Sequence, residues 1–167
     1  MDINRVKYDG TTVAIDYDNG AVRAKTESGD KPSQTFTRRL SKLRDAVLHV
    51  AEIDCEPKLI TVTGVRIVRK GDERMFVLIA KKALLESNSP LNLNLPPKPE
   101  FGDNGMPQEF VAQIDSLLEA AEEYARGQMR AQLSLFQPAG TGNGMPAEED
   151  AEELYEPALE AADELVA

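Results

Sequence analysis

The chain has 167 residues with a formal net charge of -10, 41% hydrophobic residues, 5% aromatic residues and no tryptophan. This length suits one domain with additional segments, and we expect a modest core of Val, Ile and Leu. No apolar run approaches the roughly 20 residues of a membrane span. The first residues lack the basic start and apolar stretch of a signal peptide, and the single cysteine excludes an internal disulfide. We therefore expect a cytoplasmic protein that has no membrane partner.

The negative charge is concentrated in the C-terminal third of the chain. Residues 1–100 contain 17 basic and 14 acidic residues, whereas residues 101–167 contain 2 basic and 15 acidic residues. The overall charge therefore says little about what the folded part of the chain binds.

Short strands are expected in residues 1–30. Residues 3–8 are β-prone and end at an Asp-Gly turn signal. Residues 13–17 alternate between apolar and polar side chains. The turn Asp18-Asn19-Gly20 then predicts a hairpin, because Asn and Gly tolerate positive φ, with a return strand over residues 21–26.

An amphipathic helix is predicted over residues 34–51. Its apolar residues recur at spacings of three and four: Phe36, Leu40, Leu43, Val47 and Val50. Basic residues occupy its other faces.

More strands are expected over residues 59–95. The alternation in residues 59–69 changes phase at Gly64, which predicts a β-bulge there. Residues 75–80 are continuously apolar, which is typical of a central strand covered on both faces. Residues 91–95 alternate Leu with Asn and form the last strand candidate, before a proline-rich stretch stops regular pairing.

A second helix is predicted from Pro107 to about Arg130, with one apolar face. Residues 138–146 read as a Gly/Pro linker. Residues 147–167 contain nine acidic residues and no basic residue, so we expect a disordered acidic tail. A solubilising role is the simplest account of this tail. Competition with nucleic acid for a basic surface is an alternative account.

The expected fold class is α+β: a mainly antiparallel sheet of five or six strands with one packed helix, followed by a second, C-terminal helix and the disordered acidic tail. The expected organisation is a core domain over residues 1–100, a helix ending in a binding peptide over residues 101–136, and the linker with its tail over residues 137–167.

The segment Gln132-Leu133-Ser134-Leu135-Phe136 carries the most specific motif in the chain. It resembles the bacterial sliding-clamp-binding peptide, whose pattern is Gln-Leu-Ser/Asp-Leu-Phe, at all five positions. The resemblance implies a partner, the ring-shaped clamp of bacterial DNA replication. It also implies that Leu135 and Phe136 fill a deep apolar pocket, that Leu133 occupies a shallower site, and that Gln132 forms hydrogen bonds at the cleft edge.

The competing interpretation of this segment is structural. In that interpretation Leu133, Leu135 and Phe136 form the last apolar turn of the preceding helix and fold onto the domain. The layout of residues 1–136 also loosely resembles uncharacterised proteins in the replication and recombination modules of tailed phages, which implies a phage or prophage origin and no particular activity. Clamp binding would then either recruit a phage factor to DNA replication or exclude host proteins from the clamp.

Basic clusters suggest a second function, the binding of single-stranded DNA as an accessory of replication or recombination. This interpretation requires that the clusters meet on one surface, and the alternative is an ordinary solvated face. The residues concerned are Arg38, Arg39, Lys42 and Arg44 on the helix, Arg66, Arg69, Lys70 and Arg74 around a hairpin, and Lys81 and Lys82 beyond it. A third possibility is that the acidic tail mimics DNA.

Catalytic signals are weak. The chain has one histidine, His49, and one cysteine, Cys55, so a metal site of four Cys/His ligands cannot form. The glycine-rich stretch at residues 140–144 lacks the strand and helix of a phosphate-binding loop. Asp54, Glu56 and Lys58 resemble a nuclease set, but Pro57 would disrupt the strand that such a site needs. We therefore predict a binding protein that is not an enzyme and uses neither metal nor cofactor.

Overall fold

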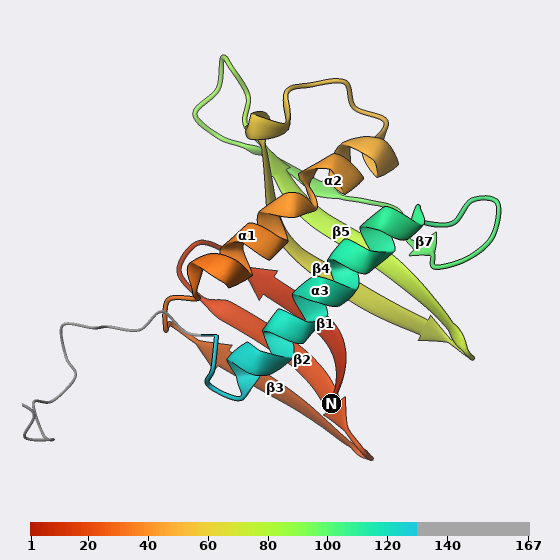
Figure 1. Cartoon of the computed structure of the whole chain (residues 1–167). Coiled ribbons are helices and arrows are strands. Elements are labelled where there is room, and N and C mark those ends of the chain that lie inside the picture. The colour runs from red at the N-terminus through yellow and green to blue at the C-terminus, as the bar shows by residue number, and fades with distance from the viewer. Residues whose placement is uncertain (130–167) are drawn as a thin grey trace, which may run out of the picture. The chain divides into compact units, whose positions relative to one another are not determined.

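The computed structural model describes residues 1–129. These residues form an antiparallel sheet with helices across one of its faces, in agreement with the predicted α+β class (Figure 1). The strand order is β3-β2-β1-β4-β5-β6, and β7 also pairs with β5. The strands are β1 (Asp2–Tyr8), β2 (Val13–Asn19), β3 (Val22–Ser28), β4 (Ile60–Lys70), β5 (Glu73–Lys82), β6 (Leu91–Asn94) and β7 (Lys98–Pro99).

The predicted helix over residues 34–51 is divided into two. Helix α1 (Gln34–Lys42) begins at Ser33, whose side chain accepts a hydrogen bond from the Phe36 backbone N–H. Helix α2 (Arg44–Ala51) follows after Leu43, which has ψ near 4° and interrupts the helical path. A short 3-10 helix, η1 (Pro57–Leu59), leads into β4. The break lets both helices keep their apolar sides on the sheet, since Leu43 and Val47 are fully buried.

Helix α3 (Gln108–Ala125) packs beside α1 and over β1. Ile114, Leu117 and Tyr124 on this helix are fully buried and belong to the same core as Val6, Phe36 and the other inward residues of residues 1–100. The described domain therefore extends past residue 100. The helix ends at Ala125, earlier than predicted, because Gly127 turns the chain with φ of 86°.

The predicted bulge at Gly64 is confirmed. The register between β4 and β5 shifts between Val62 and Gly64. A Cβ atom at Gly64 would lie 2.3 Å from the Val6 carbonyl oxygen on β1, so only glycine permits this close approach of the two strands.

The sheet face opposite the helices is covered by no described element, and we call it the open face. The expectation that residues 75–80 form a strand covered on both sides is wrong. Burial alternates along β5: Phe76 and Leu78 face the core, whereas Met75, Val77 and Ile79 are only half-buried on the open face. Within residues 1–129, no helix combines the length and apolar character needed to cross a bilayer.

Candidate functional site

The open face carries a row of charged side chains from four neighbouring strands. Arg5 on β1 lies between Asp16 on β2 and Arg66 on β4, and Lys25 on β3 is the next residue beyond Asp16. These residues share a face because each alternates with core residues, as Arg5 does with Val6 and Arg66 does with Val65.

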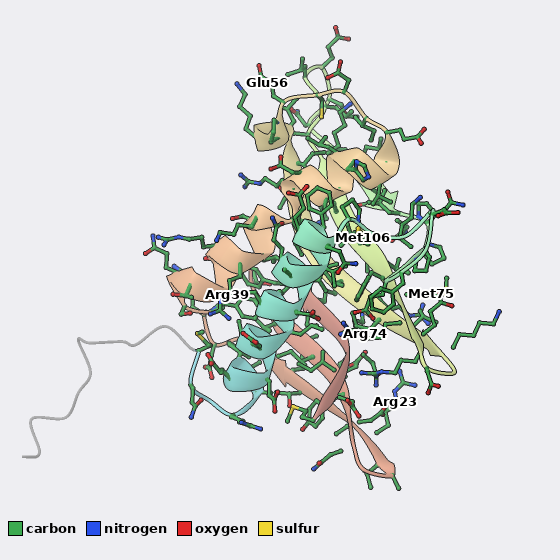
Figure 2. All side chains as sticks on the ribbon, turned by 45° about the vertical axis from the view of Figure 1, so that its right-hand side comes forward. Arg23, Arg39, Glu56, Arg74, Met75 and Met106 are labelled. Carbon is green, nitrogen blue, oxygen red and sulfur yellow. The ribbon has the colours of Figure 1, made fainter. Side chains whose placement is uncertain are left out.

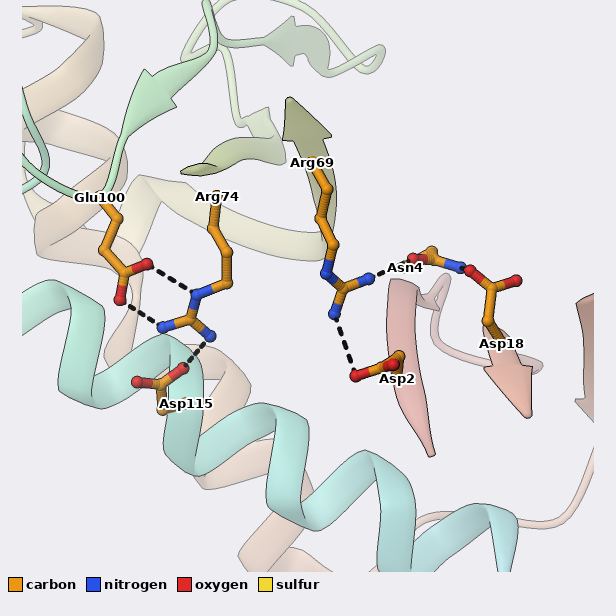
Figure 3. A network of polar contacts seen from close by, with 7 residues as sticks. All are labelled: Asp2, Asn4, Asp18, Arg69, Arg74, Glu100 and Asp115. Atoms are coloured by element: carbon orange, nitrogen blue, oxygen red, sulfur yellow. Dashed lines mark hydrogen bonds and ion pairs between the residues drawn. The ribbon is translucent and has the colours of Figure 1, made fainter. Parts of the chain in front are cut away.

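A hollow of about 670 Å³ lies in this face. Four arginines and two aspartates supply its charges: Arg5, Arg23, Arg66, Arg69, Asp16 and Asp18. Arg69 is already engaged, since its guanidinium donates to the Asn4 side-chain oxygen at 2.7 Å and pairs with Asp2 at 3.5 Å (Figure 3). Asp18 accepts a 2.7 Å hydrogen bond from the Asn4 side-chain amide.

The other three arginines of the hollow have no ion pair within the described part of the chain. The guanidinium Nε of Arg5 is moreover buried without a hydrogen-bond partner among the described residues. Burying a cationic N–H group without an acceptor is costly, so the described residues compensate Arg5 incompletely.

Further along the open face, Lys25 and Glu27 form an ion pair that neutralises both charges. Their side chains lie 2.6 Å apart. This contact raises the pKa of Lys25 and lowers the pKa of Glu27. Lys25 is therefore less available to an outside anion than Arg5, Arg23 and Arg66.

The basic residues singled out from the sequence do not lie on one surface. Arg38 and Lys42 are exposed on α1, on the helix side of the sheet. Arg39 on α1 donates to the Ser116 carbonyl oxygen of α3 at 2.8 Å and so connects the two helices. Figure 2 shows Arg39 beside the helices and Arg23 away from them, beside the strands.

Arg74 also has a structural role. It donates to Glu100 and, at 3.0 Å, to Asp115 on α3, which joins β5 to that helix (Figure 3). Both contacts raise the pKa of Arg74, and the first lowers the pKa of Glu100. Lys70 is exposed at the turn between β4 and β5. Of the ten basic residues singled out from the sequence, Arg66 and Arg69 line the hollow.

Arg5 and Arg23 did not emerge from the sequence analysis because they are isolated rather than clustered along the chain. A signal was present: Arg23 and Lys25 share one side of their strand, as do Arg5 and Lys7. The register shift between Ile3 and Arg5 conceals that pattern in β1.

The five residues of the clamp-binding motif, Gln132–Phe136, lie outside the described residues. The chain leading to them is anchored, because the Met129 carbonyl oxygen accepts a 2.8 Å hydrogen bond from the Ser33 N–H. Within residues 1–129 no group of three or more His, Cys, Asp or Glu residues could hold a metal ion. His49 is exposed and its ring lies 5.6 Å from that of Phe110, while Cys55 is half-buried.

Comparison with known proteins identifies no relative: no protein-family model, curated protein or solved structure matches this chain.

Proposed function

We propose that this protein binds the bacterial DNA sliding clamp through Gln132–Phe136 and acts as a phage or prophage accessory of DNA replication. The observation that carries the proposal is the match of all five motif positions. A fixed pattern of five common residues arises by chance in roughly one chain per few thousand of this length.

The end of helix α3 supports this proposal over the competing structural interpretation. That interpretation made Leu133, Leu135 and Phe136 the last apolar turn of the helix. The helix ends at Ala125, and Gly127 adopts a left-handed conformation that a continuing helix does not allow. Helix α3 therefore ends before the motif begins in the sequence.

The expected affinity is modest. Burial of a Leu and a Phe side chain contributes about 1.5–3 kcal/mol each, and ordering a peptide on docking offsets part of this gain. Because a micromolar dissociation constant corresponds to about 8 kcal/mol, these two anchors alone give binding weaker than micromolar. Such binding suits a protein that shares the clamp with other partners, whether it is recruited to replicating DNA or excludes them.

The test is a calorimetric titration of purified bacterial clamp with the full chain and with a Leu135→Ala/Phe136→Ala variant. We expect the variant to bind at least roughly tenfold more weakly, because two apolar anchors are lost. Leu85→Ala/Phe101→Ala is a matched control, since these residues are 89% and 64% exposed in the described domain. Equal binding by the wild-type chain and the motif variant would refute the proposal.

A synthetic peptide spanning residues 130–138 tests whether the segment is sufficient. It should compete with the full chain for the clamp at a similar concentration, because the anchors lie within it. If the chain binds but the peptide does not compete, the contact lies elsewhere in the protein.

The second candidate function is nucleic-acid binding, and the specific observation that favours it is the set of arginines without ion pairs in the open-face hollow. The helix-borne cluster predicted from the sequence lies on the opposite side of the sheet. A nucleic-acid interface on the described domain would therefore be centred on Arg5, Arg23 and Arg66.

A further inference from the structure

We infer that the open face binds the phosphodiester backbone of single-stranded nucleic acid, and that Arg5, Arg23 and Arg66 contact its phosphates. This inference rests on the second candidate function and is independent of clamp binding. It specifies the ligand, the residues and the face of the sheet.

Arg5 and Arg66 lie side by side on the open face. They are direct cross-strand neighbours on β1 and β4, so their side chains leave the sheet about 5 Å apart. Like charges in this position repel each other, and neither guanidinium has an ion pair within the described residues. A phosphate bound between them would supply two anionic oxygens to donors that now lack them.

Two acidic residues also line the hollow. Asp16 is opposite Arg5 on its other side, and Asp18 is held by Asn4. Asp16 attracts Arg5 without forming an ion pair with it, and two aspartates do not balance the three arginines that lack an ion pair within residues 1–129. The local excess of positive charge favours an anion, although Asp16 and Asp18 limit its affinity. Binding should therefore be weak and strongly dependent on salt.

The aliphatic side chains around the arginines favour a single strand over a duplex. Half-buried aliphatic side chains lie next to the arginines: Val77 pairs with Arg66 across the strands, and Val68 and Ile79 line the hollow itself. A single strand can bend its phosphates into the hollow and place unstacked bases on these side chains. A duplex keeps its bases stacked inside and is stiff over about 150 base pairs, so its convex backbone would reach mainly the rim.

Among residues 1–129, no aromatic residue lines the hollow. Stacking on aromatic rings is the usual source of strong single-strand binding, so phosphate contacts must supply most of the affinity here. Because phosphates are the same at every nucleotide, binding should show little sequence preference.

The experiment measures fluorescence anisotropy of a labelled 20-nucleotide oligo(dT) strand titrated with the full chain at several salt concentrations. The variant Arg23→Gln/Arg66→Gln keeps long polar side chains at two exposed positions and removes two charges. Arg38→Gln/Lys42→Gln removes two charges from the exposed side of α1 and is the matched control. Circular dichroism melting verifies that both variants remain folded.

We expect the open-face variant to lose at least roughly fivefold in affinity and the control variant to lose less than twofold. The slope of log affinity against log salt should become shallower by roughly 1.4 in the open-face variant, because each single-strand phosphate contact contributes about 0.7. A duplex of equal length should bind more weakly than the single strand.

Three results would overturn the inference. If the two variants lose affinity equally, nucleic acid binds elsewhere or only through net charge, and the second candidate function survives without this site. If the duplex binds as tightly as the single strand, the ligand class is wrong. If no nucleic acid binds at low salt but a peptide of residues 147–167 binds in a way that Arg23→Gln/Arg66→Gln weakens, the occupant is an acidic protein segment, and both the inference and the second candidate function fail.

Discussion

Arg5 and Arg66 face each other across β1 and β4 on the uncovered side of the sheet, and neither has an ion pair within the described residues. Like charges directly opposite in an antiparallel pair destabilise the sheet by roughly 0.2–1 kcal/mol. Asp16, on the other side of Arg5, offsets part of this repulsion. The free protein therefore contains an arrangement that an anion would relieve.

The first prediction is that Arg66→Gln stabilises the protein. Removal of the repulsion should raise the free energy of unfolding by up to about 1 kcal/mol, and the gain should shrink as salt screens the charges. Urea unfolding at low and high salt measures this. The matched control, Arg38→Gln on α1, should change stability by less than about 0.5 kcal/mol. A loss of stability in Arg66→Gln would show that Arg66 is held by a favourable contact.

The second prediction concerns Gly64. A methyl group there would lie 2.3 Å from the Val6 carbonyl oxygen and 3.2 Å from the Lys7 Cα, so β1 and β4 must separate. Gly64→Ala should lower the free energy of unfolding by about 2–3 kcal/mol. Gly29→Ala is the control, since nothing lies within 4 Å of its Cβ position. Comparable stability of the two variants would contradict the packing of β1 on β4.

Much of the sheet could be predicted from the sequence because its signals are local. The Asp18-Asn19-Gly20 signal marked the β2–β3 hairpin, although its two turn residues are Gly20 and Ala21, between the paired Asn19 and Val22. Gly20 has the positive φ that such a turn requires. The phase change at Gly64 identified the bulge, since two alternating patterns cannot share a face without an extra residue. Local residue types thus predicted one hairpin pairing and one irregularity.

The candidate site could not be predicted in the same way, because it depends on which sheet face the helices cover. The apolar run at residues 75–80 suggested a doubly covered strand, yet Val77 and Ile79 are only half-buried. Basic clusters along the chain pointed to Arg39 and Arg74 as binding residues. In the structure, both side chains donate hydrogen bonds to α3. Arg5 has no basic neighbour in sequence on β1 apart from Lys7, and it meets Arg66 only through tertiary pairing.

The third prediction is a dependence of stability on pH through Glu100. Arg74 lowers the pKa of Glu100 below its usual 4.5. The ionised carboxylate therefore stabilises the fold above about pH 4.5, and this contribution is lost as the pH falls through the lowered value. Glu100→Gln should lower the free energy of unfolding at pH 7 by about 1.5 kcal/mol, because a charge-assisted hydrogen bond is lost.

The measurement is urea unfolding of the wild type and Glu100→Gln between pH 7 and pH 3. The difference between the two proteins should decrease toward zero at the acidic end. Glu86 lies in an exposed loop, so Glu86→Gln should have the same free energy of unfolding as the wild type across this pH range. If the difference in unfolding free energy between the wild type and Glu100→Gln is constant across this pH range, the shape of the Glu100 side chain, and not its charge, explains its role.

The fourth prediction separates packing from hydrogen bonding at Tyr124, the largest fully buried side chain of the described domain. Its hydroxyl donates a 2.6 Å hydrogen bond to the Asp30 carbonyl oxygen, and its ring packs 5.6 Å from that of Phe36. Tyr124→Phe keeps the ring and should cost about 1 kcal/mol of unfolding free energy. Tyr124→Ala also loses the packing and should cost about 3–5 kcal/mol.

Amide hydrogen exchange locates the effect of Tyr124→Phe. Amide exchange in Tyr124→Phe should become faster than in the wild type only in the segment between β3 and α1. The hydrogen bond that is lost in this variant ties that segment to α3. Tyr17→Phe is the matched control: Tyr17 is half-buried, and its hydroxyl has no hydrogen bond within residues 1–129, so its removal should leave exchange there unchanged. If Tyr124→Phe costs as much as Tyr124→Ala, the hydroxyl rather than the buried ring holds α3 to the domain.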